Sequence, residues 1–84
     1  MSNQQISADA QNVAGLLASC ATGLEGLAGQ IRSIESMTGS WQDNLSNTVQ
    51  ESTQNIAGIL ASHAENLQQM SSQVSARAEH YASL

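Results

Sequence analysis

The chain carries two long runs in which apolar or small residues recur in steps of three and four. The first run comprises Ala10, Val13, Leu17, Cys20, Leu24, Leu27, Ile31 and Ile34. The second comprises Leu45, Val49, Ser52, Ile56, Ile59, His63, Leu67, Met70, Val74, Arg77 and Tyr81. This spacing places each run along one stripe of an α-helix, as in helices that pack against one another. We therefore predict an all-α fold with one helix over about residues 6–38 and a second over about residues 41–82.

The helical pattern is interrupted only around Trp41. Gly39 suits the left-handed residue that often ends a helix, and Ser40 can cap the next one. Asp43 favours the positive end of that second helix. A connection this short, at about residues 39–41, predicts an antiparallel hairpin in which the numbers of facing residues add up to about 81.

A chain of 84 residues is near the size at which one core stabilises a fold by only a few kcal/mol. A hairpin of two helices has a single seam to bury, so we expect the single domain, residues 1–84, to complete its core with another chain. The residues expected in this hairpin or dimer seam are Val13, Leu17, Cys20, Leu24, Leu27, Ile31, Ile34, Ile56, Ile59, Leu67, Met70 and Val74.

Charge narrows the class of partner. The net charge is −5 and the only basic residues are Arg32 and Arg77, whereas nucleic-acid binding and adhesion to anionic membranes need a positive patch. The longest uncharged apolar stretch, residues 10–24, falls short of the ~20 apolar residues of a membrane-spanning helix. The first five residues lack the basic and apolar regions of a cleaved signal peptide. We thus expect no membrane insertion, and any export without a cleaved leader.

Two residues invite a chemical role, Cys20 and His63, which the expected hairpin places near the same level. A cysteine nucleophile needs a cleft and an oxyanion site, and structural zinc needs four ligands. Two packed helices supply neither, and the seven carboxylates are scattered, so we expect no enzyme, cofactor or metal. Cys20 is expected to be a small buried hydrophobe, with a disulfide across a symmetric dimer as the alternative. His63 is expected to be partly buried and hydrogen-bonded, so that acidification loosens the seam.

Two other features each allow two interpretations. Gly15, Gly23, Gly26 and Gly29 lie close together on the first helix, where they either admit a second backbone or are tolerated on an exposed face. Trp41 either closes the end of the apolar seam or presents its edge as a docking feature.

Together, these features resemble the small Trp-x-Gly proteins of type VII (ESX) secretion systems, which include the early secreted antigens of mycobacteria. The shared features are two helices of this length, a tryptophan at the bend, a second helix rich in Ala, Gln and Ser, and a late aromatic residue, Tyr81. The resemblance implies a helical hairpin that pairs with itself or a related chain into a four-helix bundle. It also implies a protein secreted from a bacterium, or a targeting partner of a larger secreted effector, that meets the secretion machinery in the cytoplasm before export.

The chain departs from the family motifs at two places. Asp43 stands where the family has glycine, so the bend motif here is Gly39, Ser40, Trp41 and Asp43. Tyr81 matches the tyrosine of the family's export signal, whose acidic residue would lie four positions later, beyond Leu84. Two alternatives stay open: a subunit of a needle-like secretion assembly, and an intracellular helical adaptor.

Overall fold

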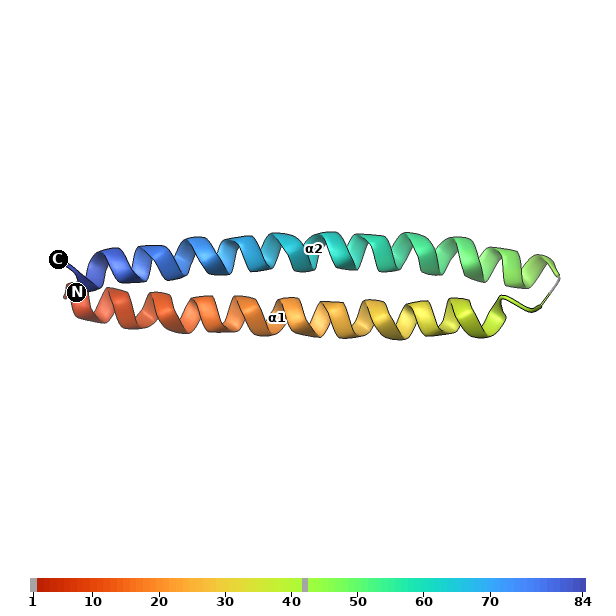
Figure 1. Cartoon of the computed structure of the whole chain (residues 1–84), viewed down its shortest axis with the longest axis horizontal. Coiled ribbons are helices and arrows are strands. Elements are labelled where there is room, and N and C mark those ends of the chain that lie inside the picture. The colour runs from red at the N-terminus through yellow and green to blue at the C-terminus, as the bar shows by residue number, and fades with distance from the viewer. Residues whose placement is uncertain (1, 42) are drawn as a thin grey trace.

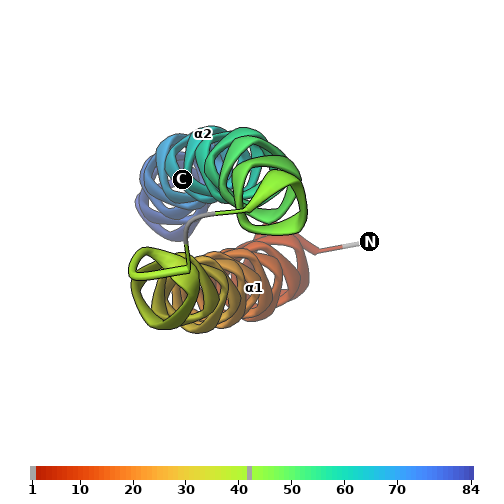
Figure 2. The ribbon, with the colours of Figure 1, turned by 90° about the vertical axis from the view of Figure 1, so that its right-hand side faces the viewer.

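The protein is an antiparallel pair of long helices. The computed structural model describes residues 2–41 and 43–84, which form α1 (Asn3–Thr38) and α2 (Asn44–Ala82). The helices lie side by side over their whole length, and the described chain is 62 Å long (Figure 1). Viewed from the end, they wind gently about each other (Figure 2). The predicted all-α hairpin is therefore confirmed.

Side-chain caps decide where both helices begin. The Ser2 hydroxyl accepts a hydrogen bond from the backbone N–H of Gln5 at 3.1 Å, so α1 starts at Asn3, before the expected residue 6. The Asp43 carboxylate accepts from the backbone N–H of Ser46 at 2.8 Å, and the Ser46 hydroxyl accepts from the Asp43 N–H at 3.4 Å. This capping box starts α2 at Asn44 rather than near Trp41.

Two expectations for the bend are therefore wrong. Asp43, not Ser40, caps α2, because its carboxylate is aimed at the free N–H groups of the first turn. Gly39 has a right-handed backbone (φ −62°), and no described non-glycine or glycine residue has positive φ. The chain reverses over all the residues between Thr38 and Asn44, so no single residue has to make a tight left-handed turn.

Small residues, rather than the large apolar ones, form the contact between the helices. We call this contact the alanine seam, and its members recur every seven residues on each helix. They are Ser7, Ala14, Ala21 and Ala28 on α1 and Ala57, Ala64, Ser71 and Ala78 on α2; all but Ser71 are buried. Side chains this small let two helix backbones approach closely, and a strict seven-residue repeat implies a left-handed winding.

Hydrogen bonds across the alanine seam fix the register of the two helices. The Ser7 hydroxyl donates to the carbonyl of Ala78 at 2.8 Å, and the Ser71 hydroxyl donates to the carbonyl of Ala14 at 2.8 Å. The numbers of these facing residues add up to 85, so the predicted register is wrong by about one helical turn. The difference arises because α2 starts later than the sequence pattern indicates.

Candidate interaction surface

One side of the hairpin is lined along its whole length by large apolar residues. Directly before each alanine-seam position lies an outer row, and three residues after it lies an inner row. The outer rows are Val13, Cys20, Leu27 and Ile34 on α1 and Val49, Ile56, His63 and Met70 on α2. The inner rows are Ala10, Leu17, Leu24 and Ile31 on α1 and Leu60, Leu67, Val74 and Tyr81 on α2. Both helices carry the rows in the same order and run in opposite directions, so all four rows share one side. We call this side the apolar face.

The outer rows are left uncovered by the hairpin itself. Five of their apolar members, Val13, Leu27, Ile34, Ile56 and Met70, are 45–47% exposed, while the inner rows are half-buried. Such uniform exposure shows that these side chains all stand at the same angle to the alanine seam. Large apolar side chains gathered on one continuous surface are typical of an interaction site rather than of a monomer's exterior.

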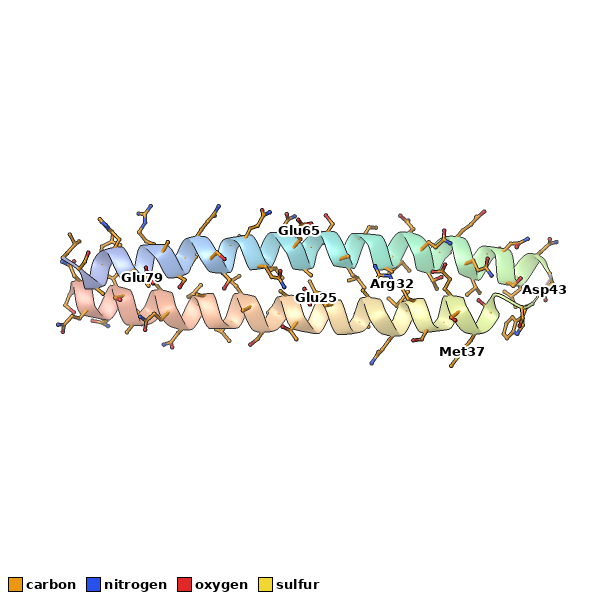
Figure 3. All side chains as sticks on the ribbon, viewed as in Figure 1. Glu25, Arg32, Met37, Asp43, Glu65 and Glu79 are labelled. Atoms are coloured by element: carbon orange, nitrogen blue, oxygen red, sulfur yellow. The ribbon has the colours of Figure 1, made fainter. Side chains whose placement is uncertain are left out.

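The opposite side of the hairpin is polar and is satisfied within the chain. The Gln68 amide donates to the Glu25 carboxylate at 2.6 Å, and the Gln54 amide donates to Glu35 at 2.9 Å. Figure 3 shows Glu25 and Arg32 on the edge of α1 that borders α2. The hairpin is thus two-sided, with hydrogen-bonded polar groups on one side and uncovered apolar groups on the other.

The bend end of the apolar face is its most exposed part. Trp41 is 50% exposed, Leu45 62% and Met37 74%. Figure 3 shows Met37 pointing away from α2, close to Asp43 at the tip. The Trp41 carbonyl accepts a hydrogen bond from the buried hydroxyl of Ser46, which ties the bend to the first turn of α2. Trp41 therefore does not close the seam within one chain, and its role as a docking feature stays a prediction.

The structure places the predicted seam residues in different surroundings. Leu17, Leu24, Ile31, Leu67 and Val74 are half-buried beside the alanine seam. The remaining predicted members, together with Ile59 (49% exposed), lie outside the contact between the helices. They would be buried only by a second chain, which is the part of the prediction that stays untested.

The sequence analysis missed the alanine seam and Leu60. Hydropathy favours large residues, so the stripe of leucine and isoleucine was taken as the contact line. The available signal was the seven-residue recurrence of Ala14, Ala21 and Ala28, which continues in Ala57 and Ala64. Alanine at each seventh position indicates a close helix contact even though its own apolar area is small.

Cys20 and His63 occupy equivalent places in the two outer rows. Both are exposed, so the expectation that Cys20 is buried is wrong for the single hairpin, because the helices meet along the alanine seam beside it. Within the described residues, no group of three or more His, Cys, Asp and Glu side chains could hold a metal ion. Partial burial of His63 also depends on a second chain.

The four glycines of α1 face open space. A methyl group built on Gly15, Gly23, Gly26 or Gly29 would meet nothing within 4 Å beyond its own helix. These glycines therefore do not serve the contact between α1 and α2. Of the two interpretations, close approach by a different chain stays a prediction.

Tyr81 ends the inner row of α2 and is half-buried. Its ring stands edge-on to that of His80, with ring centres 5.6 Å apart. In the described part of the chain, neither helix is apolar enough over a sufficient length to span a membrane. No protein-family model matches the chain, and comparisons with curated proteins and with solved structures give no match.

Proposed function

We propose that this protein is a type VII secretion substrate, or the targeting partner of one, and that it works by pairing its apolar face with a second helical hairpin. One observation carries the proposal: the hairpin satisfies its polar side internally and leaves a full-length apolar side uncovered. Pairing two such hairpins along their apolar faces gives a four-helix bundle. In this role the protein acts by association and carries out no catalysis.

The family resemblance supports the secretory part of the proposal. Two helices of nearly equal length with a tryptophan at the bend are the arrangement expected of small type VII proteins. The partner is then a second copy or a related hairpin, accompanied by a larger effector or alone. The paired bundle is formed in the cytoplasm and exported to the medium without removal of a signal peptide.

The proposal is tested with two adjacent substitutions in the native bacterial host. Met70→Glu places a carboxylate in the apolar face, whereas Gln69→Glu makes the same charge change on the exposed surface one residue away. Met70→Glu should remove the chain from the medium and separate it from its partner, because burying an unpaired charge is costly. Gln69→Glu should leave export and pairing unchanged.

Deleting the ATPase of the secretion system completes the test. Export of the wild-type chain should stop in that strain while the intracellular level is maintained. Export that continues without the ATPase would contradict a type VII role. Long polymers in light scattering would favour a needle subunit, and retention of the chain in the cytoplasm under all conditions would favour an intracellular adaptor.

A further inference from the structure

We propose that the apolar face is covered by a second copy of this chain, laid in the opposite direction, so that Cys20 and His63 of both copies meet at the two-fold axis. The bend of each copy then covers the helix termini of the other. This inference rests on the proposed association function and names the partner. It leaves secretion itself to the experiments above.

The exposed area of the hairpin matches what a dimer of two copies would bury. The described chain exposes 5765 Å². A compact folded protein of 8.8 kDa exposes roughly 4,800 Å². The excess of about 1,000 Å² is close to the ~800 Å² per partner that a stable protein interface buries. Because the apolar face runs the length of the hairpin, one further hairpin of the same length is sufficient to cover it.

The outer rows are arranged symmetrically about their centres. Extended by one turn at each end, the α1 row reads Ile6, Val13, Cys20, Leu27, Ile34. The α2 row reads Val49, Ile56, His63, Met70, Arg77. From the bounds of the helices, the middle of α1 falls at Cys20 and Ala21 and the middle of α2 at His63. A two-fold axis at mid-length therefore sets Leu27 against Val13 of the second copy and Met70 against its Ile56.

A two-fold axis at this level also solves the problem of a histidine in an apolar row. Packed elsewhere, His63 would face an apolar residue of the second copy and leave an imidazole N–H buried without a partner. At the axis it faces the same residue of the second copy, and one imidazole can donate to the other. If both bends lay at the same end, His63 would instead face Cys20, whose thiol is a weak hydrogen-bonding group.

Charge and bulk favour bends at opposite ends. The bend end carries the acidic Asp43 and the large exposed side chains of Trp41 and Leu45. The terminal end carries Arg77 and His80. Opposed bends bring unlike charges together and place the bulky bend over the terminal turns. Bends at the same end would set Asp43 beside its copy and stack the two bulky ends, which leaves the space between the hairpins uneven.

Cysteine cross-linking reads the register directly. A disulfide needs Cα atoms within about 7 Å, so only residues that face each other across the dimer are linked. With oxidised glutathione as oxidant, two thiols form one disulfide and two molecules of reduced glutathione are released. The purified full-length protein should form a covalent dimer through Cys20, and Cys20→Ser should abolish it while leaving a dimer in light scattering.

Two single-cysteine chains in the Cys20→Ser background fix the orientation. A mixture of Val13→Cys and Leu27→Cys chains should give a linked heterodimer. Neither chain should link to itself, since its two copies of the cysteine would lie about 20 Å apart along the bundle. Linkage of Val13→Cys to Met70→Cys chains in its place would show bends at the same end and overturn the proposed arrangement.

Other results overturn the second copy or separate it from secretion. A monomeric mass by light scattering at micromolar concentration, with no Cys20 linkage, would show that the partner is a different chain. Export could still occur with that other partner, and the proposed function would stand. Cross-linking in the expected register together with export that ignores the secretion ATPase would leave the dimer in place and remove the secretory role.

Discussion

Replacing Ala21 by leucine tests whether small residues hold the two helices together. Ala21 is fully buried in the middle of the alanine seam and faces Ala64, which is also fully buried. Three extra carbon atoms do not fit between backbones that approach at this distance. We expect the helices to separate locally or the leucine to adopt a strained rotamer.

The expected loss follows from the neighbours that would be affected. Overpacking of a filled contact costs about 1–3 kcal/mol. If the helices separate, Ala14 and Ala28 lose burial of one methyl group each, at about 0.8 kcal/mol per group. Ala21→Leu should therefore lower the free energy of unfolding by about 2–4 kcal/mol. For a domain of this size the melting temperature should fall by about 10 °C or more.

Ala18→Leu is the matched control. It makes the same substitution on the same helix, less than one turn away, at an exposed position. Alanine and leucine have similar helix propensity, so its effect should stay within about 0.5 kcal/mol. Urea unfolding followed by far-UV circular dichroism, at one fixed protein concentration, measures both variants. Equal stability of the two variants would refute the alanine seam as the contact between the helices.

Three further predictions concern the cap, the apolar face and export. Asp43→Ala should lower the free energy of unfolding by about 0.5–2 kcal/mol in urea titrations, while Asp43→Asn keeps the cap and most of the stability. Leu17→Ala and Leu27→Ala should each cost the paired protein about 2–4 kcal/mol by the same assay, whereas Gln30→Ala is near neutral; equal losses at all three would mean that the rows are wrongly assigned. Tyr81→Ala should reduce the amount of chain in the medium, measured by quantitative immunoblot, modestly or not at all, because the paired bundle is what the machinery recognises; complete loss would make this tyrosine the dominant signal.

Two long helices and a bend near Trp41 could be predicted from the sequence because they depend on local regularities. Steps of three and four persist on both sides of the bend, and this period is a property of the helix itself. The large apolar residues could also be assigned to one stripe of each helix. Their use as the contact between the helices could not, because a stripe wide enough for two contacts does not say which edge meets which neighbour.

The cap of α2 and the register of the helices depended on geometry that spacing alone leaves undecided. Ser40 and Asp43 are both good capping residues, and either could start a helix. The reciprocal bonds between Asp43 and Ser46 select the later start. That choice moves every residue of α2 by about one turn relative to α1, as the bond from Ser7 to Ala78 records.

Sequence by itself therefore determined the type, length and amphipathic character of the two helices. Only the tertiary structure decided that Ala21 and Ala64 meet while Leu27 and Ile56 remain half-exposed. The physical reason is that close backbone packing depends on the distance between two helices, which no single helix contains. Alanine gains from that closeness, and the larger residues beside it are left to face a second chain.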